Sequence, residues 1–184
     1  MNTKVKTKDL VLTALLIAIG IIIPVYFSFL RVTLPPAFTA TLMAHVPIFI
    51  AMFISPWSAL FTALGTTLGF WFTTSPVVTM RAASHVIFAL VGAFMLKKNC
   101  NLVLVGVVTA LLHAVFEGLV VYLFLALGFT PATEGTPILV SAFYVTGVGT
   151  IIHDIIDYVI ACGIGFALAK AKMLPALPPV WNKK

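Results

Sequence analysis

The chain has 184 residues, of which 61% are hydrophobic and only 9% are charged. A soluble domain has roughly 25% charged residues, and the mean hydropathy of this chain is +1.16. The composition therefore excludes a soluble globular enzyme and predicts a polytopic membrane protein. The net charge of +6 does not indicate a nucleic-acid-binding surface, because no basic patch is interleaved with aromatic residues.

Six apolar stretches have about the length that a helix needs to cross the hydrocarbon core of a membrane. The third is the shortest and is rich in Gly and Thr. We predict a single integral membrane domain over residues 1–184, with an all-α fold of six transmembrane helices and no internal repeat. In chain order the predicted spans cover residues 10–30, 37–54, 57–72, 77–96, 102–127 and 144–169.

The positions of Lys and Arg predict that both termini are cytoplasmic, because these residues concentrate on the cytoplasmic side of membrane proteins. With the N-terminus inside, nine lysines lie on the cytoplasmic side, and only Arg31 and Arg81 lie outside. The opposite orientation would invert this ratio. The first apolar stretch is too long for a secretory signal and lacks a small-residue cleavage site, so we interpret it as a spanning helix.

Ionisable side chains inside the predicted spans are the strongest functional signal. A charge at the bilayer centre costs about 2.5–3.5 kcal/mol even on a lenient scale, so such residues normally face a cavity or a partner. Three pairs on three different spans are four residues apart, which places both members on one helix face. The predicted substrate-binding residues are Arg81, His85, His113, Glu117, His153, Asp154 and Asp157.

The depths of these residues predict a pocket that opens outward. At 1.5 Å per residue, His153 and Asp154 lie roughly 14 Å from the outer end of their helix, and Glu117 lies roughly 15 Å from the outer end of its own. Arg81 and His85 lie within the first two outer turns of the fourth span. Structural alternatives remain: Arg81 could extend to the outer headgroups, and the other groups could form buried pairs.

The sequence leaves the roles of His45 and Asp157 open. His45 lies in the second predicted span and is as consistent with a structural hydrogen bond as with a site role. Asp157 lies one turn deeper than the other acidic residues of its helix, so it could brace His153 or His113 instead of contacting a ligand.

Short segments resemble a known family. Ala14 and Ala18 form an AxxxA pair in the first span, and Gly65 and Gly69 form a GxxxG pair in the third; such pairs let helices approach closely. The stretches KTKDLVLTALLIAIG, HVPIFIAMFISP and RAASHVIFALVGAF, in a short chain of six predicted spans, resemble the S components of energy-coupling factor (ECF) vitamin transporters. The resemblance covers the whole chain.

The resemblance implies a substrate-capture subunit in a bacterial cell membrane, which is not an enzyme and needs no cofactor or metal. The vitamin would bind near the outer face, between spans four to six and the first outer loop, Arg31 to Pro36. Ala14 and Ala18 would contact the transmembrane coupling subunit, and two ATP-binding subunits would drive delivery. The other expected partners are the vitamin and the lipid bilayer, without nucleic acid.

The charge of the predicted site narrows the substrate. Three carboxylates accompany one arginine, which favours a ligand that offers hydrogen-bond donors or positive charge. Pyridoxine or hydroxymethylpyrimidine fits this balance best among small nitrogen heterocycles. Niacin comes next, because its carboxylate would need Arg81 or Arg31 as a partner.

Two other classes of protein fit the same residues. One is a standalone proton-coupled carrier that uses Glu117 and Asp157 as its relay. The other is an intramembrane metalloenzyme, with His113, Glu117, His153 and Asp157 as zinc or iron ligands.

Overall fold

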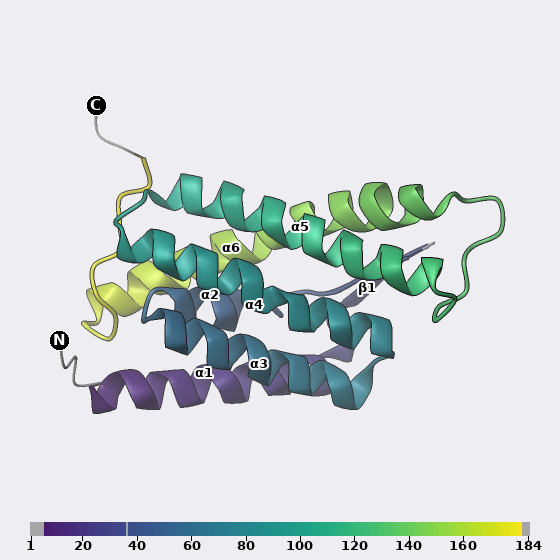
Figure 1. Cartoon of the computed structure of the whole chain (residues 1–184). Coiled ribbons are helices and arrows are strands. Elements are labelled where there is room, and N and C mark those ends of the chain that lie inside the picture. Colours follow the sequence, from purple (N-terminus) through teal and green to yellow (C-terminus); the bar gives the residue numbers. More distant parts are fainter. Residues whose placement is uncertain (1–5, 36, 182–184) are drawn as a thin grey trace.

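The computed structural model describes residues 6–35 and 37–181. Long helices lie side by side along one axis and enclose a short helix and a two-stranded hairpin (Figure 1). In chain order the elements are α1 (Thr7–Tyr26), η1 (Ser28–Leu30), β1 (Arg31–Leu34), β2 (Phe38–Thr41), α2 (Val46–Met52), α3 (Pro56–Thr73), α4 (Pro76–Lys97), α5 (Leu102–Ala126), η2 (Val140–Thr146) and α6 (Gly147–Lys170).

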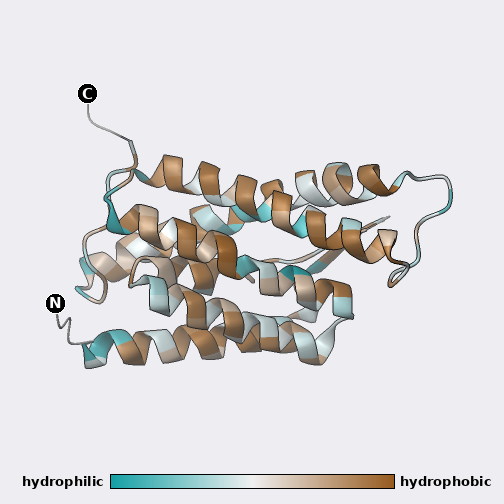
Figure 2. Ribbon diagram, in the orientation of Figure 1, coloured by the Kyte–Doolittle hydropathy of each residue, from teal (hydrophilic) through white to brown (hydrophobic). Residues whose placement is uncertain are grey.

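The chain is an all-α membrane protein apart from its short hairpin. In the part of the chain that the structure describes, four helices are long and apolar enough to cross a membrane: α1, α4, α5 and the continuous helix Val140–Lys170. Large apolar side chains are exposed along them, for example Leu15, Leu111 and Ile152. Hydrophobic residues cover most of the helices, whereas hydrophilic ones gather at the bundle ends and in its middle (Figure 2).

The prediction of one helix over residues 37–54 is wrong. Strands β1 and β2 pair antiparallel, with Arg31 opposite Thr41, and α2 has only seven residues. The strands contain three Thr and one Val, residues that favour extended backbone, and their pairing satisfies backbone groups that lipid could not. Met43 has a φ of 69°, which interrupts any continuous helix. Pro36, in the predicted first outer loop, lies outside the described residues.

Helix α2 is enclosed by the bundle instead of facing lipid. All seven of its residues are buried, and Phe49 packs against Phe88 of α4 and Tyr158 of α6, with ring centroids 5.4 and 5.0 Å apart. Helix α2 is too short to span a membrane by itself. Because it is buried, the turn that precedes it, which includes His45, lies in the middle of the bundle.

Close packing of α1 on α3 explains the GxxxG pair. A Cβ added to Gly69 would lie 2.6 Å from Cγ of Pro24 and 2.7 Å from the carbonyl oxygen of Ile21, so only glycine permits this approach. Gly65 contacts α1 in the same way. The pair is therefore an internal helix contact, whereas Ala14 is exposed on α1.

The last helix begins earlier than the predicted boundary at residue 144. The π-helical segment η2 runs directly into α6, so that helical backbone covers residues 140–170. The hydroxyl of Thr146 donates to the carbonyl oxygen of Ser141 at 3.0 Å, which satisfies a carbonyl in the wider π-turn. Further along α6, Thr150 and Asp154 contact α5, whereas Asp157 contacts the turn that precedes α2.

Candidate substrate-binding site

The structure brings all seven predicted site residues into one buried network. The pairs on α4 and α5 and the three residues on α6 converge because each set lies on the inward face of its helix. Each of these residues has a relative exposure of 9% or less: Arg81, His85, His113, Glu117, His153, Asp154 and Asp157. Whether they contact a substrate remains a prediction.

Glu117 is the centre of this network. Its Oε2 atom accepts hydrogen bonds from Nη2 of Arg81 at 2.8 Å and from the hydroxyl of Thr150 at 2.5 Å. Its Oε1 atom lies 3.2 Å from Nε2 of His85 and 3.5 Å from Nε2 of His113. One carboxylate therefore joins α4, α5 and α6.

Arg81 connects the network to the hairpin. It donates from Nη1 to the Thr39 hydroxyl at 3.1 Å and from Nη2 to the Thr39 carbonyl oxygen at 3.0 Å. Its guanidinium also lies 5.9 Å from the ring centre of Phe38. With 4% exposure, Arg81 points into the protein, so the alternative in which it extends to the headgroups is wrong.

Asp157 holds the turn between β2 and α2. Its carboxylate accepts the backbone N–H groups of Met43 at 2.9 Å and of His45 at 3.0 Å. Oδ2 also lies 3.2 Å from Nδ1 of His45 and 3.6 Å from Nε2 of His153. The neighbouring Asp154 accompanies a different ring, with Oδ1 at 2.7 Å from Nδ1 of His113. Asp157 thus braces His45 and the turn as well as His153. The neighbour of His113 is Asp154 instead.

His45 is the residue that sequence reasoning left out of the site. Its ring centroid lies 4.5 Å from those of His85 and His113 and 4.7 Å from that of His153. The other three of the chain's four histidines therefore gather around it. A polar residue inside an apolar segment is the signal in the sequence that could have pointed to His45. The prediction of a helix for that segment did not place His45 in the site. Thr39 and Thr150 carried no comparable signal.

A narrow cavity reaches this network from the end of the bundle that carries the hairpin and the α3–α4 connection. It has a volume of about 20 Å³, and Arg31, Arg81, His45, His85, Glu117 and His153 contribute to its lining. A wider hollow of about 520 Å³ adjoins it, between the hairpin and the α3–α4 connection, and both share Arg31 and Thr39. The inner cavity has room for about one water molecule. A vitamin could enter only if the lining side chains moved apart.

The fold and the site define a class of protein. Apolar helices enclose a polar network that is connected to one end of the bundle, which is the arrangement of a membrane protein that handles a polar small molecule. Such intramembrane ionisable groups mark substrate or ion pathways.

Comparison with known proteins identifies the family. Over 176 residues the chain is 38% identical to the niacin transporter NiaX of Lactococcus lactis subsp. cremoris (strain MG1363), an alignment that covers 91% of this chain and 78% of that protein. No protein-family model and no solved structure matches the chain. The chain belongs to the S components of ECF-type vitamin transporters. It is a multi-pass protein of a bacterial cell membrane and is not an enzyme.

Proposed function

We propose that this chain is the substrate-capture subunit of an ATP-driven ECF importer and that its substrate is niacin. The observation that carries the proposal is the identity of 38% to a niacin transporter across 91% of the chain. The buried polar network beneath an end-facing cavity supports it. On this ground we place niacin ahead of pyridoxine and hydroxymethylpyrimidine, the substrates that charge balance alone favours.

Arg31 supplies the partner that the niacin carboxylate needs. Arg81 is already committed to Glu117 and Thr39, whereas Nη2 of Arg31 is buried and has no hydrogen-bond partner. Arg31 also lines both the inner cavity and the outer hollow. A guanidinium pairs well with a carboxylate in two-point geometry. Phe70, another lining residue, offers an apolar surface to the pyridine ring.

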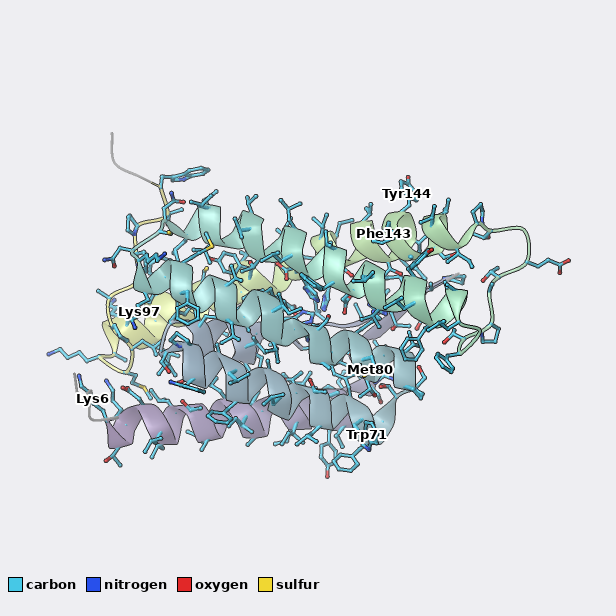
Figure 3. The ribbon with its side chains drawn as sticks, in the orientation of Figure 1. Lys6, Trp71, Met80, Lys97, Phe143 and Tyr144 are labelled. Carbon is cyan, nitrogen blue, oxygen red and sulfur yellow. The ribbon has the colours of Figure 1, made fainter. Side chains whose placement is uncertain are left out.

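We further propose that both termini are cytoplasmic and that the chain crosses the membrane six times. Lys6 and Lys97 lie at one end of the bundle, and Trp71 and Tyr144 lie toward the other (Figure 3). Nζ of Lys8 donates to the carbonyl oxygen of Lys172 at 3.2 Å, which joins the two ends of the helical region. Strand β2 and helix α2 together make the second crossing, enclosed by the longer helices.

A labelling experiment tests this topology. After replacement of the native cysteines, Cys introduced at Thr133, in the exposed α5–η2 connection, should react with an impermeant maleimide in intact cells. Cys introduced at Lys98, exposed at the other end, should react only after permeabilisation. The reverse pattern would overturn the orientation.

Equilibrium binding tests the substrate. The purified chain should bind nicotinate saturably, without other subunits or ATP, and more tightly than pyridoxine or hydroxymethylpyrimidine. Arg31→Gln should weaken nicotinate binding more than binding of the neutral nicotinamide, since only the former has a carboxylate to pair. Tight binding of pyridoxine and none of nicotinate would refute the assignment.

Transport in proteoliposomes separates an S component from a standalone proton-coupled carrier. An S component should accumulate nicotinate only when the coupling subunit and the two ATP-binding subunits are present with ATP. Accumulation by the chain alone, driven by a pH gradient, would instead establish Glu117 and Asp157 as candidates for a proton relay.

A further inference from the structure

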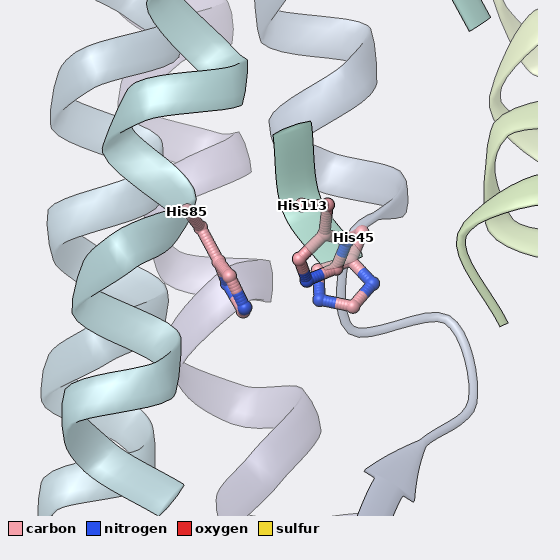
Figure 4. Close-up of side chains that lie close together, drawn as sticks. All are labelled: His45, His85 and His113. Atoms are coloured by element: carbon pink, nitrogen blue, oxygen red, sulfur yellow. The ribbon is translucent and has the colours of Figure 1, made fainter. Parts of the chain in front are cut away.

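Three histidines meet beside the inner cavity, and two of them, His45 and His85, line it. His45 precedes α2, His85 lies on α4 and His113 lies on α5, and they are 3%, 2% and 1% exposed. One ring nitrogen from each lies within 4.8 Å of the others, and the three rings point toward one another (Figure 4). Elements distant in the sequence thus direct imidazole nitrogens at a common point.

Each of these rings also lies beside its own carboxylate. Asp157 Oδ2 is 3.2 Å from Nδ1 of His45, and Glu117 Oε1 is 3.2 Å from Nε2 of His85. Asp154 Oδ1 is 2.7 Å from Nδ1 of His113. Metal-binding histidines commonly pair one ring nitrogen with a carboxylate, which fixes the ring and leaves the other nitrogen for the metal.

Two ring nitrogens of this cluster make no hydrogen bond in the described part of the chain. Nδ1 of His85 and Nε2 of His113 are buried, and the contact of the latter with Oε1 of Glu117 is long, at 3.5 Å. A buried polar atom without a partner is unfavourable in a protein interior and more so in a membrane. A cation bound at the cluster would supply a partner for such nitrogens.

The charge of the cluster points to a cation. Glu117, Asp154 and Asp157 contribute three negative charges and Arg81 one positive charge, which leaves −2 when the histidines are neutral. These four residues are each at most 5% exposed, so water screens this charge little. A divalent ion would balance it.

We propose that His45, His85 and His113 bind a divalent transition-metal ion of the zinc type, with its open coordination position toward the cavity. Imidazole nitrogens favour zinc and its neighbours over magnesium or calcium. In a tetrahedral site with Zn–N bonds near 2.05 Å, ligand nitrogens are about 3.3 Å apart. The rings therefore need to close by no more than about 1.5 Å. The ion is a part of the binding site and not the centre of an enzyme.

The open position suits the ring nitrogen of the substrate. Resting on the proposed function, this extension assigns the two polar ends of niacin to two partners, with its carboxylate on Arg31 and its pyridine nitrogen on the ion. Pyridine is a ligand of the same type as imidazole. The ion would also resolve the mismatch between an anionic vitamin and a cluster with an excess of carboxylates.

Metal content tests the ion independently of any vitamin. Protein purified without a polyhistidine tag, loaded with Zn²⁺ and freed of excess metal, should retain about one ion per chain. His85→Ala and His113→Ala should retain almost none. Thr109→Val is the matched control on α5, because the Thr109 hydroxyl bonds only its own helix, at Val105 and Gly106. It should keep the metal.

A variant with a different metal ligand distinguishes loss of the site from misfolding of the alanine variants. His85→Cys replaces one ligand by another, so this variant should bind Co²⁺ and show a thiolate-to-cobalt absorption band absent from the unsubstituted protein. Retention of metal by both alanine variants, or equal metal loss in Thr109→Val, would overturn the site. So would unsubstituted protein that binds no Zn²⁺ or Co²⁺.

Nicotinate and benzoate, which differ at the ring nitrogen, test the substrate contact. Metal-loaded protein should prefer nicotinate by at least about tenfold, and chelation should reduce that preference to near unity. A preference that survives complete removal of metal would overturn the contact with the ring nitrogen. Failure of nicotinate to bind in any state would overturn the proposed function, while the metal content would still test the ion.

Discussion

Removing the charge of Glu117 should destabilise the protein more than any surface substitution. In Glu117→Gln, the guanidinium of Arg81 loses its carboxylate counterion and keeps only neutral acceptors, such as Thr39, while it remains 4% exposed. Breaking a buried ion pair by removing one member costs about 3–5 kcal/mol. At roughly 2–4 °C per kcal/mol for a chain of this size, the melting temperature should fall by about 6–20 °C.

Thermal unfolding in detergent micelles, followed by tryptophan fluorescence, measures this loss. Glu134→Gln, in the exposed α5–η2 connection, makes the same chemical change and should leave the melting temperature unaltered. Arg81→Met combined with Glu117→Gln leaves neither charge unpaired. The double variant should therefore be more stable than the two single losses predict, by at least about 1 kcal/mol. Additive losses, or a Glu117→Gln variant as stable as the control, would refute the reasoning.

Three further substitutions test other parts of the structure. Gly69→Ala should cost about 1–3 kcal/mol of stability, because its Cβ would meet the Ile21 carbonyl oxygen at 2.7 Å. The control Gly163→Ala, whose Cβ would have nothing within 4 Å, should be neutral or stabilising in thermal unfolding. Equal losses of stability in the two variants would contradict the packing of α1 on α3. Tyr158→Phe should cost about 1–2 kcal/mol through the lost 2.8 Å bond to the Leu102 carbonyl oxygen; an unchanged melting temperature would refute this. Ala14→Trp should abolish ATP-dependent uptake but preserve nicotinate binding; loss of both would place the docking face elsewhere.

The long helices could be predicted from the sequence because a lipid environment requires long runs of apolar residues. Long apolar runs must become helices in a membrane, since only internal hydrogen bonds can satisfy their backbone. Helices α4 (Pro76–Lys97) and α5 (Leu102–Ala126) accordingly begin and end within one residue of the predicted spans 77–96 and 102–127. The grouping of Arg81 with Glu117 followed from helical spacing and depth alone.

The second predicted span shows where such reasoning fails. The segment from 37 to 54 is apolar enough for a helix, but its hydropathy does not reveal whether lipid or protein surrounds it. The bundle encloses it, so irregular backbone is possible there: Asp157 of α6 satisfies the N–H groups of Met43 and His45. That long-range contact determines the position of His45, and no local pattern in the sequence encodes it.

Nicotinate binding to the chain alone in oriented membrane vesicles tests the central claim most directly. We propose that the end of the bundle from which the cavity leads to the polar network is extracellular, so right-side-out vesicles should bind nicotinate saturably without ATP or partner subunits. Inside-out vesicles should bind it only after permeabilisation. Absence of binding in both preparations, or binding confined to intact inside-out vesicles, would contradict an outward-facing niacin site.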